Sequence, residues 1–444
     1  MKRKLLAALI MMCSGAAVSA ADANHAYYQP GMGMGEQVAQ VSHCDHDAGC
    51  GCEVPCDCDP GCGVEPGCGL EPADCGCEAP GCDGGCDGGC GGGCPMSIFG
   101  GDCDLGDPFS LFGEAGAWSA GGWVQLGYHT DALPLFNSRP DNVQLHQMWL
   151  YAEKSIDTSC GFDVGGRIDY VYGTDGPDTQ AFGLSNGHWD SSWTNGNDYG
   201  HAIPQLYLEA GYGDLSFKVG HFYTLIGYEV VTAPDNFFYS HAYTMYNSEP
   251  FTHTGVLGTY NASDDVTVWG GYTLGWDSGF EDNGDSFLGG LSLSLTDDVS
   301  LTYAAIGGRF NKEPGERGYM QSLVLDVAVT DNLQYVFQTD YLDSTDANGA
   351  TVRNTFDINQ YAIYTINDCL AAGARFEWYN ESGVYTPIND ESDIYALTLG
   401  TNIKPHANVL IRPEVRFDWD SDEVAGLEEG SDQTTFGIDT ILLF

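Results

Sequence analysis

The chain has 444 residues, of which 63 are acidic and 15 are basic, so its formal net charge at pH 7 is −48. No basic residue occurs between Lys4 and Arg139, which excludes nucleic acid as a partner because binding to phosphates needs clustered Lys and Arg. Beyond the N-terminal twenty residues no apolar run is long enough for a transmembrane helix, so only strands could cross a membrane.

Residues 1–20, MKRKLLAALIMMCSGAAVSA, combine three basic residues, an apolar run and an end of small residues. This order is typical of a secretory signal peptide with its cleavage site. We therefore expect the mature chain to leave the cytoplasm.

Residues 21–110 form a low-complexity region of Gly, Pro, Asp and Glu that holds fourteen of the seventeen cysteines. The region has too few large apolar side chains for a core, so we predict a disordered extension that only cross-links could order. Its stretch APGCDGGCDGGCGGGCP spaces four cysteines at intervals of four residues. These disulfide candidates are Cys82, Cys86, Cys90 and Cys94.

Residues 115–444 change to short alternating segments rich in Tyr, Trp, Val and Leu. In GFDVGGRIDYVYG, for example, Phe162, Val164 and Ile168 alternate with Asp163 and Asp169. A period of two gives each strand one apolar and one polar face. In NVLIRPEVRFDWD the proline lies on the apolar face, which indicates either a bulge at Pro413 or a different register for this strand. The predicted strands are 115–130, 143–156, 161–174, 201–212, 214–222, 252–261, 264–277, 285–295, 299–310, 317–329, 333–343, 354–366, 370–380, 391–403, 408–419 and 433–444.

The connections between these segments alternate between tight turns, such as Thr296-Asp297-Asp298, and longer loops of variable length. Outer-membrane barrels have short periplasmic turns, longer external loops and an even number of strands. We therefore predict an all-β fold, a transmembrane antiparallel β-barrel of about 16 strands. The last segment, TTFGIDTILLF, ends on Phe444, and a terminal aromatic resembles the signal read by outer-membrane assembly machinery.

The run GHFYTLIGYEVVTAPDNFFYSHAYTMYNSEPFTHTG, from Gly220 to Gly255, and the TVWGGYTLGWDSGF that follows it resemble the OmpL-like beta-barrel porin family (beta-barrel porin 2). The resemblance covers most of 120–444. It implies an outer-membrane pore without indicating a solute. The Cys-rich region is not part of the family pattern, so the resemblance says nothing of its role.

The third long loop, Tyr223 to Phe251, is unusually aromatic for an exposed loop. We expect it to fold into the lumen and narrow the channel, as the third loop does in the general-diffusion porins that it resembles; the alternative is an external loop that packs on a neighbouring protomer. Opposed charges across such a constriction would filter solutes by charge and dipole. The predicted constriction residues are Glu229, Asp235 and Glu249 on the loop and Arg167, Arg375, Arg412 and Arg416 on the wall, although each arginine could equally form a wall salt bridge.

From residue 115 onward there are 46 acidic and 12 basic residues. Vestibules with this charge concentrate cations, an effect that weakens as salt shortens the screening length. The stretch DWDSDEVAGLEE spaces Asp418, Asp420, Asp422 and Glu429 like calcium ligands, but Glu423 replaces the glycine that such loops need. We expect a solvated acidic loop, no metal and no cofactor, and the absence of catalytic motifs argues against an enzyme.

Sixteen strands with seven tight turns place both ends of the barrel in the periplasm, and the Cys-rich region with them. An oxidising compartment favours disulfides over thiolate metal sites, and the cysteine spacings do not match zinc motifs. An internally bonded spacer, cross-links to envelope proteins, a metal site and a plug in the lumen all stay open.

These inferences predict an outer-membrane porin of a Gram-negative-type cell, with the barrel at 115–444 and a periplasmic Cys-rich tether. Its partners would be outer-membrane lipid, small hydrophilic solutes or cations, further copies in a homotrimer, and disulfide-linked envelope proteins. The alternative is a non-conducting structural or adhesive barrel that disulfides fix in the envelope.

Overall fold

The computed structural model describes residues 103, 105–112, 114–133, 135–181, 189–196, 198–311, 315–383, 392–420 and 432–444. The predicted signal peptide and Cys82, Cys86, Cys90 and Cys94 lie outside the described residues. Within the described ranges, no helix is long and apolar enough to span a membrane.

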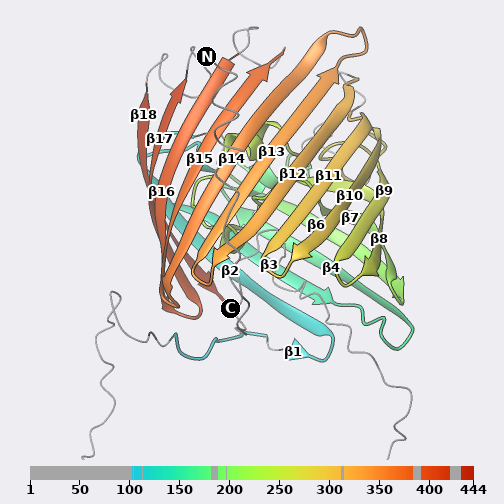
Figure 1. Ribbon diagram of the computed structural model, residues 1–444, viewed down its shortest axis with the longest axis horizontal. Helices are drawn as coiled ribbons and strands as arrows, with labels where there is room; N and C mark the ends of the chain where they lie inside the picture. Colours follow the sequence, from blue (N-terminus) through green and yellow to red (C-terminus); the bar gives the residue numbers. More distant parts are fainter. Residues whose placement is uncertain are drawn as a thin grey trace, which may run out of the picture.

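Sixteen long strands form one closed antiparallel barrel (Figure 1). Each pairs with its neighbour along the chain, and the pairing of the last strand with the first, Ile441 opposite Gln125, closes the ring. The strands are β2 (Trp118–His129), β3 (Gln144–Lys154), β4 (Phe162–Gly173), β6 (Tyr199–Tyr212), β7 (Leu215–Tyr223), β8 (Thr252–Ser263), β9 (Val266–Thr273), β10 (Asp285–Thr296), β11 (Val299–Arg309), β12 (Arg317–Thr330), β13 (Leu333–Thr345), β14 (Thr351–Asn367), β15 (Leu370–Ser382), β16 (Ser392–His406), β17 (Val409–Asp420) and β18 (Gln433–Leu443). The predicted sixteen-strand barrel is confirmed.

Shorter elements lie at the edges of the sheet and in the loops. The two-residue strands β1 (Glu114–Ala115) and β5 (Thr194–Asn195) pair with β2 and β6. The short helices are η2 (Leu135–Asn137), α2 (Gly176–Thr179), η3 (Ala233–Asp235) and α3 (Tyr243–Asn247).

The alternation in sequence becomes an apolar outer face and a polar inner face. On β4, Phe162 is 69% exposed on the outside, whereas Arg167 and Asp169 are buried on the inside. The bulge, one of the two alternatives for Pro413, is absent, because β17 stays in register with β18 through the Pro413–Ile438 pair. The pairing with β16 is interrupted at the proline instead. Proline has no backbone N–H to donate, and a strand residue donates its N–H to one neighbouring strand only, so the loss affects one side of β17.

The two rims differ as expected. Two-residue turns close one rim, for example between β10 and β11, and the longer loops lie at the other. The first and last barrel strands begin and end at the rim of short turns, where Figure 1 places the C-terminus.

The residues just before the barrel run along this rim of short turns. Cys103 forms a disulfide with Cys369, in the turn between β14 and β15. From there residues 105–112, which we call the rim segment, pass the turn between β16 and β17. The amide of Ala407 donates to the carbonyl of Leu105, and Asn408 exchanges two hydrogen bonds with the backbone of Phe109.

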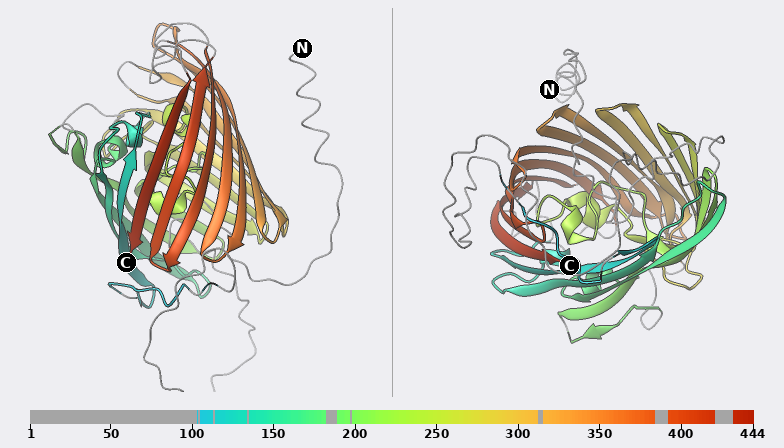
Figure 2. Two further views of the ribbon diagram at one scale, coloured as in Figure 1. Left: turned by 90° about the vertical axis from the view of Figure 1, so that its left-hand side faces the viewer. Right: turned by 90° about the horizontal axis from the view of Figure 1, so that it is seen from below.

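Residues 224–251, which we call loop 3, lie inside the barrel, where Figure 2 shows them as the yellow-green segment within the ring of strands. Their apolar side chains pack on the inner wall: Phe237 and Phe238 contact a cluster that includes Val336 and Ile363. Ile226 joins a second cluster on the wall of β6 to β13. The aromatic composition of the loop is thus explained by burial in the lumen and not by contact with another protomer.

Candidate channel constriction

Three arginines of the inner wall hold loop 3 from Glu229 to His241. Arg375 lies on β15, and Arg412 and Arg416 lie on β17. All three side chains point into the barrel, because side chains an even number of residues apart on a strand point to the same face. All three are at most 2% exposed. A buried charge needs partners close by, and the loop and the wall carboxylates together supply them.

Arg375 is the central link between loop and wall. Its Nη1 lies 2.6 Å from the carboxylate of Glu229 and also donates to the carbonyl of Ser240 at 2.6 Å. Its Nε donates to Glu377 on the same strand at 2.8 Å. Burial alone would raise the pKa of Glu229, but the Arg375 guanidinium and the other partners lower it to about 2. Glu229 is therefore ionised at neutral pH.

Arg412 fixes the path of the loop backbone. Its Nη1 donates to the carbonyls of Ala233, Asn236 and Phe238, at 2.7, 2.6 and 3.1 Å. Its other side forms an ion pair with Asp439 on β18 at 2.6 Å. One guanidinium thus gathers three carbonyls around η3 through Nη1 while its Nε and Nη2 bind Asp439, two tasks that the single nitrogen of a lysine could not perform together.

Arg416 continues the series towards the rim of longer loops. It donates to the carbonyl of His241 at 2.8 Å and pairs with Asp418 and Glu377 at 2.8 and 3.0 Å. Glu377 therefore lies between two arginines and accepts in addition the amide of Tyr243 at 2.8 Å.

The wall also binds loop amides directly. The two carboxylate oxygens of Glu414 accept the amides of Tyr239 and Ser240, at 2.9 and 3.1 Å. Three strands further around the barrel from β17, Gln147 of β3 donates to the carbonyl of Val231 at 2.8 Å. Loop 3 is thus attached on several strands through its backbone, which leaves little freedom for its position.

The end of loop 3, at Glu249, contacts a different part of the inner wall, which β13 and β14 form. Glu249 accepts a hydrogen bond from Gln338 of β13 at 2.5 Å, and the same amide nitrogen donates to Asp340 at 3.1 Å. Asp357 of β14 accepts the amide of Asp340 at 3.2 Å. All three carboxylates are at most 5% exposed. Burial, and then the neighbouring Asp340, raise the pKa of Glu249 well above its usual value.

The remaining predicted residues have separate surroundings. Arg167 pairs with Glu153 and Asp169 of the wall, at 3.0 and 2.6 Å, and these ion pairs do not involve the loop. Asp235 accepts the hydroxyl of Thr232 at 2.5 Å, and burial raises its pKa to about 6.

The structure thus brings together Glu229 with Arg375, whereas Glu249 meets carboxylates. The loop carboxylate of Glu229 and the wall guanidinium of Arg375 form a direct ion pair, and both side chains are buried. Their effect on ion selection stays a prediction. Sequence reasoning missed Glu377 and Glu414 as loop-binding residues, although each lies two residues after a predicted wall arginine, Arg375 or Arg412, and therefore on the same face. Among the described residues, no group of three or more His, Cys, Asp or Glu side chains is arranged to hold a metal ion.

Known structures with this barrel include OmpT, an outer membrane protein of Vibrio cholerae, in its in-vitro folded form. The two share 12% identity at a TM-score of 0.50, over 74% of this chain and 97% of that one. The trimer form of the same protein matches at 13% identity and TM-score 0.50, over 74% of this chain and all of that one. Identities this low show a common fold alone.

A search of curated proteins found no match to the chain. The sequence profile of a family described as "Putative beta-barrel porin-2, OmpL-like" matches residues 118–444. The match covers the whole barrel, from the first residue of β2 to the C-terminus, and includes loop 3 with the arginines that hold it. The chain therefore belongs to the OmpL-like beta-barrel porin-2 family of outer-membrane porins.

Proposed function

We propose that the barrel is a water-filled channel for small hydrophilic solutes across the outer membrane, with loop 3 as its constriction. The observation that carries this proposal is the attachment of loop 3 inside the lumen by Arg375, Arg412 and Arg416. A loop fixed by its backbone at several points sets a constant channel width. A barrel of sixteen strands leaves an aqueous channel unless something fills it.

We also propose that the channel is weakly cation-selective. Of the 12 basic residues from residue 115 onward, four (Arg167, Arg375, Arg412 and Arg416) are buried and paired with carboxylates. Paired in this way they contribute little positive potential to the lumen water. Their six carboxylate partners are held in these ion pairs with them, so 40 acidic residues (46 minus 6) remain against 8 basic ones (12 minus 4).

Reconstitution in a planar bilayer tests both parts of this proposal. We expect discrete channel openings and a reversal potential, under a KCl gradient, on the side of the cation. The preference should weaken as the salt concentration rises, because screening shortens the range of the acidic vestibules. A preference for anions would refute the selectivity, and silence of a folded, inserted protein would refute the channel.

A second candidate function is a structural barrel that disulfides fix in the envelope. The Cys103–Cys369 bond favours it, because this bond fastens the end of the Cys-rich region to the rim of short turns. On this reading the N-terminal region lies in the periplasm and carries the cross-links. Non-reducing gels of isolated envelopes test this: ladders that collapse with reductant would support cross-linking between chains, and a single monomer band would oppose it.

We further propose that the rim of longer loops faces outward and that the barrel assembles as a homotrimer. A trimer form is known for OmpT of Vibrio cholerae, which has the same fold. Cross-linking of the purified protein in detergent should yield a band at three times the monomer mass.

A further inference from the structure

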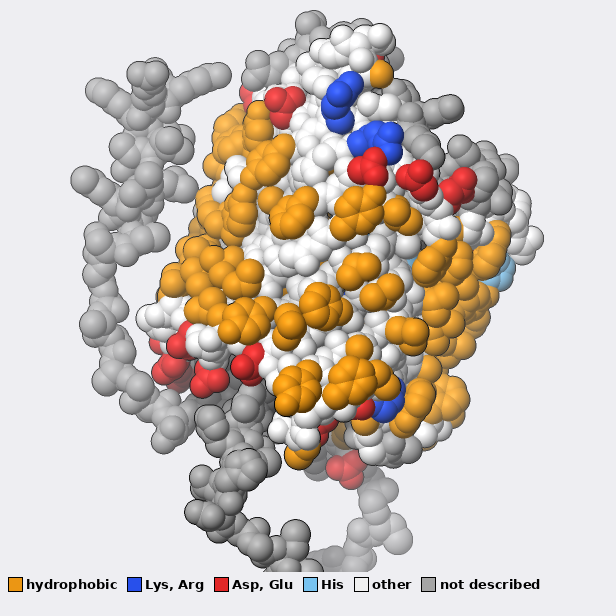
Figure 3. Space-filling view, turned by 90° about the vertical axis from the view of Figure 1, so that its right-hand side faces the viewer, with side chains coloured by type: hydrophobic (Ala, Val, Ile, Leu, Met, Phe, Trp, Pro, Cys, Tyr) orange, Lys and Arg blue, Asp and Glu red, His pale blue; other side chains and the backbone are white. Residues whose placement is uncertain are grey.

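Two arginines lie side by side on the outer face of the barrel, near the rim of longer loops. Arg309 at the end of β11 and Arg317 at the start of β12 are directly paired residues of the sheet. Both point outward, because Ala304 and Ile306 of β11 are buried on the inside and Arg309 has the opposite parity. Figure 3 shows basic side chains on this face just above the band of apolar ones.

This pair is unusual on electrostatic grounds. Like charges directly opposite each other on neighbouring strands are destabilising. Arg309 forms an ion pair with Asp285, yet its Nε is buried without a hydrogen-bond acceptor. Arg317 is exposed and forms no ion pair with the residues that the structure describes. The pair therefore lacks an acceptor that an external anion could supply.

A cleft lies beside the two arginines. It encloses about 830 Å³ and is lined by both guanidinium-bearing residues, by Tyr319 and Tyr341, and by Asp343. The backbone of Gly308, Gly315 and Gly318 forms its floor, because these positions carry no side chain. The cleft is wide enough for a headgroup and has donors along one edge.

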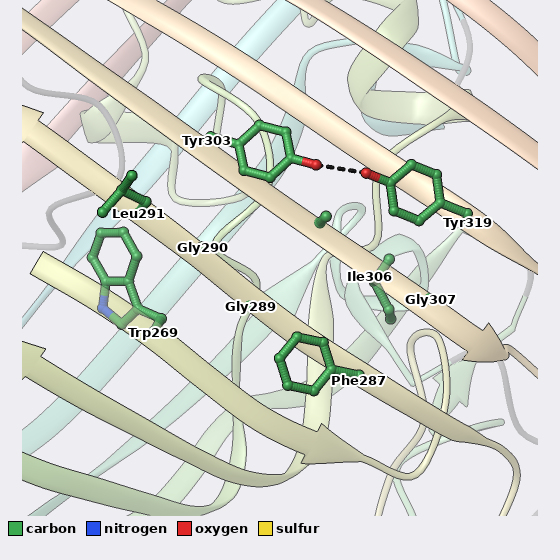
Figure 4. A pocket seen from close by; sticks show the side chains of 10 residues that line it. Trp269, Phe287, Gly289, Gly290, Leu291, Tyr303, Ile306, Gly307 and Tyr319 are labelled. Carbon is green, nitrogen blue, oxygen red and sulfur yellow. Dashed lines mark hydrogen bonds between the residues drawn. The ribbon is translucent and has the colours of Figure 1, made fainter.

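A second, apolar cleft adjoins the first one further from the rim. It encloses about 460 Å³ between Trp269, Phe287 and Tyr319, over the glycines at 289, 290 and 307 (Figure 4). Tyr319 lines both clefts, and its hydroxyl exchanges a 2.5 Å hydrogen bond with that of Tyr303 at the boundary. The two clefts together form one groove with a basic end and an apolar end, which we call the outer groove.

We propose that the outer groove binds a phosphorylated lipid of the outer leaflet, with the phosphate on Arg309 and Arg317 and an acyl chain along Tyr319 towards Trp269. This inference rests on the proposed orientation, with the longer loops outward. A phosphate accepts several guanidinium donors at once, and the apolar end has the character of an acyl-chain site within the membrane. The buried Nε of Arg309 has no acceptor and Arg317 is exposed, so both guanidinium groups can still donate to an anionic headgroup.

The acidic neighbours define which source of phosphate fits. Asp285 and Asp343 nearly cancel the charge of the two arginines, so no strong field attracts free anions. Binding must then combine the guanidinium contacts with packing of the acyl chain on the apolar end of the groove, a contact that free phosphate cannot make. A lipid-anchored phosphate should bind, and inorganic phosphate should not compete with it.

The test uses the full chain in phosphatidylcholine nanodiscs that contain phosphatidic acid with brominated acyl chains. Native mass spectrometry counts the retained phosphatidic acid, and bromine quenching reports its contact with tryptophan. We expect the R309A/R317A double variant to lower retention about tenfold or more, as expected for the loss of charge-assisted hydrogen bonds. Arg139→Ala, which removes another arginine near the rim of longer loops, is the matched control and should retain the lipid.

A second variant tests the apolar end separately. A Cβ at Gly307 would lie 3.5 Å from the Tyr319 ring and 3.9 Å from the carbonyl oxygen of Gly318, both ordinary contact distances, so Gly307→Val adds side-chain volume to the cleft. We expect it to reduce the quenching, and Trp269→Phe should identify the tryptophan that is quenched.

Three results would overturn the proposal: unchanged retention in R309A/R317A, equal retention of phosphatidylcholine alone, or displacement by inorganic phosphate. Protection of the groove by a second copy of the chain, seen as cross-links between Cys substitutions at Tyr319, would assign it to a protomer interface instead. Lipid retention is measured without conductance. A protein that retains the lipid but does not conduct would refute the proposed channel function only. A protein that conducts but does not retain the lipid would refute lipid binding in the outer groove only.

Discussion

The two ends of loop 3 place the same residue type in opposite surroundings. Glu229, near the start, lies 2.6 Å from Arg375 and close to a wall that bears two more arginines. Glu249, near the end, shares the amide of Gln338 with Asp340. Both glutamates are buried to a similar degree. The nature of the wall, and not burial, therefore decides whether a loop glutamate is held by an ion pair or by a hydrogen bond from a neutral amide.

The two ends should respond to pH in opposite directions. The pKa of Glu229 is lowered to about 2, so its contribution to the free energy of unfolding is present above about pH 4.5 and is lost as the pH falls through about 2. The pKa of Glu249 is raised by burial and by Asp340, so its contribution is complete below about pH 4.5 and is lost as the pH rises through the folded value. Acid loosens one end of the loop, and base loosens the other.

Removal of Arg375 should break the basic end with the largest effect. Arg375→Ala leaves Glu229 and Glu377 buried without their central partner, and the loss of one member of a buried ion pair costs about 3–5 kcal/mol. We expect a lower urea midpoint in detergent and noisier, larger single-channel currents as loop 3 detaches. Arg139→Ala is the control, because Arg139 pairs with the 64% exposed Asp198 and should cost about 1 kcal/mol or less. Equal effects of the two variants would contradict the assigned role of Arg375.

A substitution at Gly227 should disturb the place where the two ends of the loop meet. Gly227 has φ +94°, and a Cβ there would lie 2.2 Å from a carboxylate oxygen of Glu249. Gly227→Ala therefore combines backbone strain with displacement of Glu249, at a cost of about 1–3 kcal/mol. Gly213→Ala, also at positive φ but with open space around it, shows the cost of strain alone. The prediction fails if Gly227→Ala is no worse than this control.

Glu249→Gln should sharpen the contrast, because it replaces a carboxyl group that titrates with an amide that does not. An amide has no charge to acquire, so the stability of the variant should stay constant as the pH rises above about 4.5, whereas the stability of the wild type falls. Near pH 4 the two proteins should behave alike. Glu229→Gln is the matched comparison and should be destabilised at neutral pH, because it gives up the Arg375 ion pair. Unfolding midpoints across the pH range decide the matter, and parallel curves for wild type and Glu249→Gln would refute it.

The smallest effect is expected at Asp235, which lies in the first half of the loop without a direct arginine partner. Burial raises its pKa to about 6, so its contribution is present below about pH 3.8 and is lost as the pH rises through about 6. Asp235→Asn should remove this dependence and change the stability at pH 7 by about 1 kcal/mol or less, towards greater stability. A clear loss of stability at pH 7 would show that the basic wall acts on Asp235 as strongly as on Glu229.

The barrel could be predicted from the sequence, because one face of every strand contacts lipid and the other faces the lumen, so apolar and polar side chains alternate with a period of two. It also predicted the path of loop 3, since residues such as Phe237 and Phe238 need an apolar contact. It could not assign partners: Arg167 and Arg375 have the same pattern, yet Arg167 pairs with Glu153 and Asp169 of its own wall region. Partner choice depends on register across strands and on the loop path, and neither leaves a local signal. The Cys103–Cys369 bond was missed for the same reason, because its partners are 266 residues apart.

The rim segment has a consequence for the closure of the barrel. The disulfide joins the base of β15 to a segment that leads directly into β2, so the frame from β2 to β15 is a covalent ring that excludes β16, β17 and β18. At this rim the opening left for the last three strands is limited by the length of chain between Cys103 and Trp118, at most about 3.3–3.6 Å for each residue. The disulfide and the rim segment therefore close a covalent ring over β2 to β15, whereas β18 is joined to β2 by noncovalent pairing.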